Sequence, residues 1–412
     1  MIKKSLVFLI SSLFLSSCPY DDASAYFPLN TIMVKRNGST EKAVVQSQTQ
    51  RFSTFYSTLE TPSISINKKG NYIVTWTDSK NGTRDVYARK FTIGGIAQGE
   101  AFQVNTTEAG DQNLPCVALS DNDEYIITWS GKSSSGNGYD VYARKYTSSG
   151  SSGNEFKVNT SVLGDQWISS VSINSRGSYV IVWQSSNQDG DGFGIVGQKF
   201  DAKGNFFGGE FLINSVTNGS QELSDIDMNA NGEFVVVWKG NQNYSNTVDV
   251  NTRKFTDIYA RKFDNKGSAT GSEITVSTTI GENNFPSVSI NDSQSFSIVW
   301  NVKENNTPNY DIYARTIIGN NQNTQAFKVT GFNRPDALSK SVVGIDNNNN
   351  TTVVWGSDIN NRLTNGIFMK KFNSKNQEVA PEIKVNLNGS VLQPEIFLEK
   401  KSADFSIVWK QY

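Results

Sequence analysis

Val180-Ile181-Val182-Trp183 is the clearest of seven similar stretches in the sequence, each an apolar run that ends in tryptophan. The seven tryptophans stand at positions 76, 129, 183, 238, 300, 355 and 409, so successive copies are 53, 54, 55, 62, 55 and 54 residues apart. A nearly fixed period of this length is typical of repeat architectures, in which every copy folds into the same supersecondary unit. The chain is therefore predicted to contain seven copies of one unit.

Each copy has the pattern of four short strands. An alternating strand such as Ser170–Ile173 leads through a turn at Gly177 to the tryptophan strand. A third strand begins with Asp-Val-Tyr-Ala-Arg, as in Asp140–Arg144, and a fourth covers Glu155–Asn159. Four strands in about 54 residues is the size of a propeller blade. The sequence predicts an all-β fold, a seven-bladed β-propeller of four-stranded blades.

The seventh copy stops just after its tryptophan strand, which leaves its blade two strands short. The N-terminal segment Thr31–Arg36 resembles the third strand of the sixth copy, and Lys42–Val45 follows it as another short strand. We expect these N-terminal strands, at about 30–47, to pair with the C-terminal strands at about 391–410. Such closure completes the last blade and removes a free sheet edge.

Residues 1–17 have the features of a targeting segment, with two lysines ahead of the apolar stretch Leu6–Leu15. The stretch runs into Leu-Ser-Ser-Cys at Cys18, which resembles the bacterial lipobox. The resemblance implies that Cys18 is lipidated and that 18–27 form an anchor linker ahead of a propeller over 28–412. It also implies a location in the cell envelope, at the outer membrane if the cell is Gram-negative, with the propeller in the periplasm or at the surface. The alternative is an ordinary signal peptide cleaved nearby.

Charge and composition exclude several classes of function. The 38 basic and 39 acidic side chains give a net charge of -1, which provides no general attraction to nucleic acid. The chain has no histidine, which removes histidine-based catalytic triads and histidine-ligated metal centres. A glycosidase that uses two carboxylates needs no histidine, so that class of enzyme stays open.

Two further patterns are interpreted as structural. Cys116 has no disulfide partner once Cys18 is lipidated, and its apolar strand pattern predicts a small buried core residue. The Asp, Tyr and Arg of the third strand recur in four copies, which favours an ion pair between blades over one active site; the copies begin at Asp85, Asp140, Asp257 and Asp311. A near-copy of the third strand at Asp249–Phe255 precedes Asp257–Phe263, and we take the second as the strand.

The candidate ligand-binding residues lie in the loops between strands. Loops after the second and fourth strands emerge on one face of a propeller, and variable loops on a rigid scaffold commonly carry binding. Trp167 lies there and is the one tryptophan outside the repeat set, so its ring can stack on a sugar or a partner side chain, or pack into its own loop. Gln112 and Gln166 belong to Gly-Asp-Gln motifs at the same place and are further candidates.

Calcium is the one cofactor that the sequence suggests. Asn187–Gly192 places Asp189 and Asp191 in one loop with two glycines, an arrangement that resembles a calcium-binding turn. The loop lacks the twelfth-position glutamate of an EF-hand, and a plain polar turn is the alternative.

Three functional hypotheses follow. The first is a non-enzymatic envelope scaffold, anchored to the membrane by lipid, that binds an envelope or extracellular protein through its loop-rich face. The second is a carbohydrate-binding propeller that uses Trp167, and the third is a carboxylate-pair glycoside hydrolase. The sequence favours a binding protein over an enzyme and predicts no nucleic-acid partner.

Overall fold

The fold is taken from a computed structural model, which describes residues 25–34, 49–54, 62–80, 83–92, 95–107, 110–132, 138–161, 164–241, 256–277, 281–304, 310–319, 324–330, 337–338, 340–358, 366–385, 391–398 and 405–411. The expected targeting segment, Cys18 and the near-copy at Asp249–Phe255 lie outside these residues. Within them the chain forms strands and no helix, and no helix is long and apolar enough to cross a membrane.

The strands form six four-stranded sheets and one five-stranded sheet, and the strand pairing is antiparallel throughout. The sheets, each written from its inner strand outward, are β3 (Ser63–Ile66), β4 (Tyr72–Lys80), β5 (Thr83–Phe91) and β6 (Phe102–Gln103); β7 (Gln112–Leu119), β8 (Tyr125–Lys132), β9 (Tyr139–Tyr146) and β10 (Phe156–Lys157); β11 (Gln166–Ile173), β12 (Tyr179–Ser186), β13 (Phe193–Phe200) and β14 (Phe211–Leu212); β15 (Gln221–Met228), β16 (Phe234–Gly240), β17 (Asp257–Phe263) and β18 (Ile274–Thr275); β19 (Gly281–Ile290), β20 (Phe296–Glu304), β21 (Tyr310–Ile317) and β22 (Phe327–Lys328); β23 (Ala337–Leu338) with β24 (Val342–Ile345), β25 (Thr351–Asp358), β26 (Gly366–Phe372) and β27 (Glu378–Lys384); and β28 (Val391–Leu398), β29 (Phe405–Gln411), β1 (Ala25–Val34) and β2 (Thr49–Thr54).

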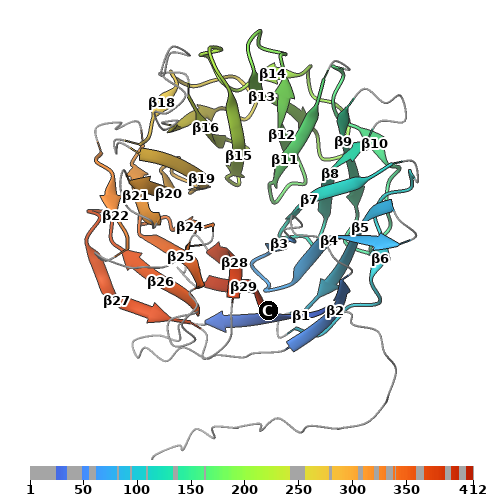
Figure 1. The fold of residues 1–412 in the computed structure, drawn as a ribbon, viewed down its shortest axis with the longest axis horizontal. Helices are drawn as coiled ribbons and strands as arrows, with labels where there is room; N and C mark the ends of the chain where they lie inside the picture. The colour runs from blue at the N-terminus through green and yellow to red at the C-terminus, as the bar shows by residue number, and fades with distance from the viewer. Residues whose placement is uncertain are drawn as a thin grey trace, which may run out of the picture.

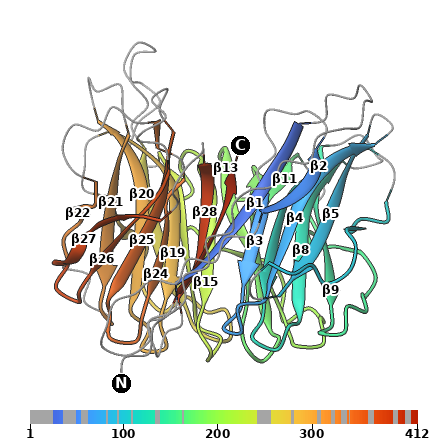
Figure 2. The same cartoon turned by 90° about the horizontal axis from the view of Figure 1, so that it is seen from below.

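The sheets stand around a ring, with the first strand of each sheet innermost (Figure 1). Seen from the side, the strands run between the two ends of the ring (Figure 2). This is a β-propeller fold, as the repeat predicts. The fourth strands are shorter than expected: β10 contains only Phe156–Lys157, whereas the sequence pattern indicated five residues.

The tryptophan strands form the core because they are apolar on both faces. All seven residues from Tyr179 to Ser185 on β12 are buried, and Trp183 is fully buried. Trp183 packs against Val141 and Ala143 of the preceding sheet, while Trp129 packs against Val86 of the sheet before that. Five of the described tryptophans, Trp129, Trp183, Trp238, Trp300 and Trp355, belong to clusters that span two neighbouring sheets. Truncating one of them to alanine is expected to cost about 3–5 kcal/mol.

The inner strands have one unpaired edge, and side chains of the preceding sheet satisfy it. Ser63 Oγ accepts a hydrogen bond from the backbone N–H of Val117 at 3.2 Å. Asp225 Oδ2 accepts one in the same way from Val288 at 3.1 Å. Because an unpaired backbone donor is costly when buried, these contacts both stabilise the edge and hold successive sheets in register.

Cys116 occupies the same inner position and packs against the core of the β7–β10 and β11–β14 sheets, so the expectation of a core residue is confirmed only in part. It is a free cysteine and only half-buried, with Ser63 Oγ 3.9 Å from its sulfur. The residue is not fully buried because its strand is the inner edge of its sheet.

The third-strand arginines also differ from expectation. Arg144 Nη1 donates to the backbone carbonyl of Val104 at 2.9 Å, and Arg261 Nη1 donates to that of Ile213 at 2.9 Å. Both acceptors belong to the preceding sheet, so the arginines do link neighbours. The predicted inter-sheet ion pair is wrong at these positions, since the acceptor is a carbonyl at the end of the outer strand. The choice of Asp257–Phe263 as the third strand is confirmed.

The two ends of the chain share one sheet. β1 pairs with β2 on one side and with β29 on the other, and β29 pairs with β28. Asn30 pairs with Trp409. Aligning Thr31–Arg36 with the third strand of the sixth copy would instead place Met33 opposite Trp409, so the observed register differs by three residues. The second strand covers Thr49–Thr54, whereas the pattern indicated Lys42–Val45.

Candidate functional site

Trp167 lies near the start of β11, next to an irregularity that recurs in several sheets. The pairing of β11 with β12 shifts register between Trp167 and Ser170, and Ile168 has a φ of 50°. The equivalent residues have φ values of 51° to 53°, and they are Leu114, Leu223 and Phe285. A β-bulge re-aims the side chains beside it. The repeated bulge thus separates the loop-facing start of each inner strand from its packed remainder.

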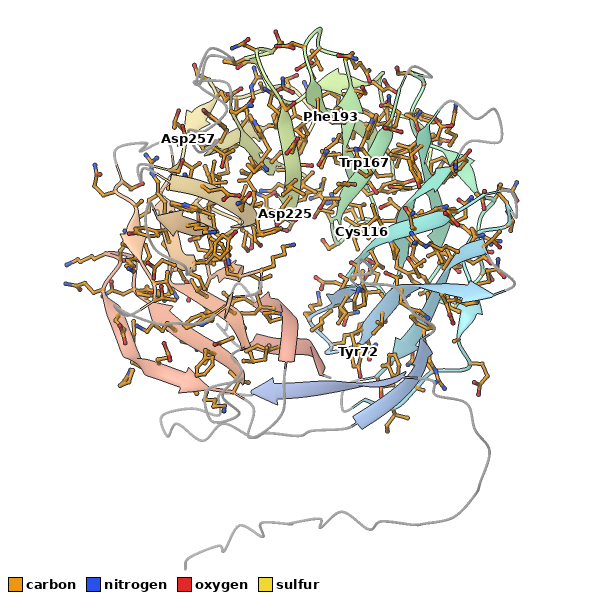
Figure 3. All side chains as sticks on the ribbon, in the orientation of Figure 1. Tyr72, Cys116, Trp167, Phe193, Asp225 and Asp257 are labelled. Carbon is orange, nitrogen blue, oxygen red and sulfur yellow. The ribbon has the colours of Figure 1, made fainter. Side chains whose placement is uncertain are left out.

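Three aromatic rings meet at this point. The Trp167 ring stacks on Tyr139, with 6.2 Å between ring centroids and 21° between planes. It lies 6.4 Å from the ring of Phe193 at 40°. All three side chains are half-buried, and Figure 3 shows Trp167 and Phe193 close together near the ends of β11 and β13. Trp167 therefore packs against its neighbours and also keeps part of its surface open to solvent.

Trp167 has an unused polar group inside this aromatic cluster (Tyr139, Trp167 and Phe193). Its Nε1 is buried and has no hydrogen-bond partner among the residues that the structure describes. A buried indole N–H normally finds an acceptor, since leaving it unpaired costs about 1–3 kcal/mol. The N–H is therefore an unsatisfied donor that solvent does not reach while the ring holds this position.

The loops of the following sheets fix the positions of the other two rings. The backbone N–H of Tyr139 donates to Asp165 Oδ1 at 3.0 Å, and that of Phe193 donates to Ser220 Oγ at 3.4 Å. The same bond joins Arg84 to Asp111 at 3.2 Å one sheet earlier. The aspartate of the Gly-Asp-Gln motif therefore holds the start of a third strand in the preceding sheet, which is a structural role.

The glutamines of these motifs are not available to a ligand. Gln112 and Gln166 are fully buried. Trp129 Nε1 donates to Gln112 Oε1 at 3.0 Å, and Trp183 Nε1 donates to Gln166 Oε1 at 3.1 Å. Their expected place on the loop-rich surface is thus corrected: they point into the sheet because the buried indole N–H of the tryptophan strand needs an acceptor.

The two aspartates of the suggested calcium loop are engaged by protein donors. Asp189 Oδ2 accepts from Asn214 Nδ2 at 2.8 Å, and Asp191 Oδ2 accepts from the backbone N–H of Gly219 at 2.9 Å. Asp189 Oδ1 also lies 3.4 Å from the backbone nitrogen of Asp191. Within the described ranges no group of three or more acidic, cysteine or histidine side chains is placed to hold a metal ion.

Other carboxylates serve to join neighbouring sheets. Glu155 Oε2 accepts from the backbone N–H of Thr106 at 2.5 Å, and Glu273 Oε2 accepts from that of Ser215 at 2.8 Å. Glu210 makes the equivalent bond to Thr160. Each of these glutamates begins an outer strand and binds the loop that leaves the outer strand of the sheet before it. Their repetition argues for structure rather than catalysis.

The thiol near the centre of the ring is also not set up as a nucleophile. Cys116 and Asp225 lie on inner strands on either side of β11 (Figure 3). Burial raises the pKa of the Cys116 thiol above its ordinary value, with Asp225 acting in the same direction. A raised pKa keeps the thiol protonated near neutral pH, and the thiolate is the reactive form.

Sequence reasoning missed Tyr139 and Phe193. The signal was present, because each is the residue just before the position of the third-strand aspartate in two adjacent copies. Comparing the copies shows an aromatic residue at that position both in the copy that carries Trp167 and in the copy before it. What the pattern could not show was that the bulge at Ile168 brings the three rings together.

Neither a protein-family model nor a curated protein matches the sequence. Several solved structures share the fold. Polysaccharide lyase Uly1 matches with a TM-score of 0.55 at 10% identity, covering 93% of this chain and 97% of its own. An ulvan lyase of family PL25, bound to -[GlcA(1-4)Rha3S]-, matches with a TM-score of 0.57 at 13% identity, covering 84% and 90%. The α-L-arabinofuranosidase Arb93a of Fusarium graminearum matches with a TM-score of 0.50 at 9% identity, covering 76% and 92%. At these identities the similarity concerns the fold.

Proposed function

We propose that this chain is a seven-bladed, lipid-anchored β-propeller that binds carbohydrate at the aromatic cluster of Tyr139, Trp167 and Phe193. Seven sheets and the pairing of β1 with β29 support a ring that the two chain ends close together. The lipobox-like sequence at Cys18 supports an anchor in the cell envelope. Anchoring would hold the propeller at a surface where polysaccharides are available.

The observation that carries the proposal is that the Trp167 side chain is only half-buried while it stacks on Tyr139 and lies beside Phe193. The axial C–H groups of a sugar ring give it an apolar face, which packs on the electron-rich face of an aromatic ring. A rigid stack that already exists before binding loses little conformational entropy when the ligand arrives.

The structural neighbours give independent support, since the named activities of three of them concern polysaccharides or glycosides. They favour a carbohydrate ligand over the protein partner that the sequence suggested first. A hydrolase has less support, because the glutamates and aspartates traced above are held by structural hydrogen bonds.

The test is retardation of the full chain, purified in detergent, in native gels cast with single polysaccharides. We expect at least one polysaccharide to retard the wild-type protein and to retard Trp167→Ala much less. Trp167→Phe serves as the matched variant that keeps a ring. If no polysaccharide retards the protein and an envelope protein is captured in stoichiometric amount, the result would favour a protein-binding scaffold instead.

A further inference from the structure

A second concave site lies at the opposite end of the ring from the aromatic cluster. A cleft of about 520 Å³ opens between the β3–β6 sheet and the β7–β10 sheet. Its walls come from Tyr125 and Tyr146, and the turn Ser148–Ser152 forms one rim. The volume falls within the range of roughly 300–1,000 Å³ that small-ligand sites occupy.

The residues that line this cleft carry positive charge without a carboxylate among them. Among the residues that the structure describes, Lys90 Nζ makes one long hydrogen bond, 3.5 Å to the carbonyl of Ser148, and it lies 5.1 Å from the centre of the Tyr125 ring. An ammonium group has three donors, so Lys90 retains donors for a ligand. Arg144 adds a second cation. Its guanidinium donates to the carbonyls of Gly153 and Val104 at 2.9 Å and to Ser152 Oγ at 2.8 Å, which leaves two of its five N–H groups for a ligand.

The remaining lining supplies neutral polar groups. Gln98 and Gln103 come from one sheet, and Ser149 comes from the turn of the other. The Tyr146 hydroxyl is buried and has no hydrogen-bond partner among the residues that the structure describes. Amides and hydroxyls both donate and accept, which suits the hydroxyl groups of a sugar, whereas the two cations suit an anionic substituent.

Comparison between sheets explains why the cleft is open here. Ser152 forms an isolated bridge with Tyr146, and Phe206 forms the equivalent bridge with Phe200 one sheet later. The Phe206 ring packs against Phe200 at 5.0 Å and against Phe156 at 6.4 Å. A phenylalanine therefore covers in the next sheet the space that the serine leaves open.

We propose that the cleft between these two sheets binds an acidic saccharide, with Lys90 and Arg144 facing its carboxylate or sulfate group. The sugar part of this ligand rests on the proposed carbohydrate-binding function, and the requirement for an anion rests on the cleft itself. The site is separate from the Trp167 cluster, so the two can be tested independently.

The probes are three hexasaccharides: oligogalacturonate with carboxylates, a heparin fragment with sulfates, and neutral maltohexaose. Affinity is measured by calorimetry on the full chain in detergent. Ser152→Phe fills the cleft as Phe206 does in the next sheet, and Ser152→Ala removes only the hydrogen bond to Arg144. Ala269→Phe adds the same ring at the equivalent exposed position of the β15–β18 sheet.

We expect at least one acidic hexasaccharide to bind, with an affinity that falls about tenfold or more in Ser152→Phe and in Lys90→Gln. Ser152→Ala, Ala269→Phe and Trp167→Ala should bind it as the wild type does, and whichever acidic probe binds identifies the anionic group. Unchanged binding in Ser152→Phe, equal binding of maltohexaose, or no binding of either acidic probe would overturn the proposal. If Trp167→Ala is the one variant that loses binding of the acidic hexasaccharide, the proposed cleft site is wrong and the aromatic cluster is the binding site.

Discussion

Asp189 Oδ2 accepts a hydrogen bond from Asn214 Nδ2 at 2.8 Å. In the neighbouring sheet the equivalent asparagine donates to an aspartate of the third strand instead. In the β7–β10 sheet, Asn159 Nδ2 donates to Asp140 Oδ1 at 2.7 Å. The strand position of Asp140 is occupied by Gly194 in the β11–β14 sheet. A Cβ atom added at Gly194 would lie only 2.7 Å from Asp189 Cγ, so the loop carboxylate fills the space of the missing side chain.

This exchange predicts a rescue experiment. Asp189→Ala should lower the free energy of unfolding by about 1–3 kcal/mol, because the Asn214 amide loses its charged acceptor and keeps only the longer bonds to Val216 O and Gln221 Oε1. Gly194→Asp alone should also destabilise, through collision with Asp189. The double variant should recover most of the loss, since the new aspartate takes the place that Asp140 has in its own sheet. Urea unfolding measures all three, and strictly additive losses would contradict the account.

Calcium is expected to have no effect on stability through this loop. Asp189 Oδ2 already accepts a hydrogen bond from Asn214 Nδ2, and Asp191 Oδ2 accepts one from the backbone N–H of Gly219. These bonds hold the two carboxylates in place, and the described residues bring no third acidic side chain to them. Thermal melting with millimolar calcium and with a chelator should give the same midpoint, and a rise with calcium that Asp191→Asn abolishes would show a metal site.

Alkaline pH should destabilise the protein through its buried tyrosines. Burial raises the pKa of Tyr179, and nearby Asp201 acts in the same direction. Burial likewise raises the pKa of Tyr146 to about 12. Because the folded pKa lies above the unfolded value of about 10, the stability is fully present below pH 10 and is lost as pH rises above it.

Tyr179→Phe isolates this effect. The Tyr179 hydroxyl is buried without a partner in the described part of the chain, and Phe234 begins the equivalent strand of the next sheet. The variant should match the wild type at pH 7 within about 0.5 kcal/mol and lose less stability between pH 10 and pH 12. Parallel unfolding curves for the two proteins across that range would refute the assignment.

Gln166→Leu separates structure from binding at the loop-rich face. The change removes the acceptor of the Trp183 N–H, so we expect a loss of about 1–3 kcal/mol in the free energy of unfolding. Saccharide affinity should stay within about twofold, because Gln166 is buried. Loss of affinity without loss of stability would mean that the glutamine reaches the ligand after all.

The repeat made the sheets predictable, because the tryptophan period and the alternation of strands such as Ser63–Ile66 are local signals. Contacts between copies were harder. Asp165 and Gln166 are adjacent in sequence, yet one bonds to Tyr139 of the preceding sheet and the other to Trp183 of its own. Successive side chains of an extended segment point to opposite faces, but the sequence does not say which sheet each face meets.

The arginine of the third strand shows the same limit. Its spacing from Asp140 predicts a shared face, but the carbonyl of Val104 that Arg144 binds has no signature in the sequence. Backbone acceptors become predictable only when the outer strand's end is known. Two-residue strands such as Phe156–Lys157 are too short for the sequence pattern to show where they end.

The central claim is that the Trp167 stack is where carbohydrate binds. The most direct measurement is calorimetric titration of the wild type, Trp167→Ala and Trp167→Phe with an oligosaccharide of whichever polysaccharide retards the protein. We predict that alanine weakens binding by about 10- to 100-fold, the effect of removing an aromatic anchor, while phenylalanine keeps it within about fivefold. Equal affinity in all three proteins, with their folds intact, would contradict the claim.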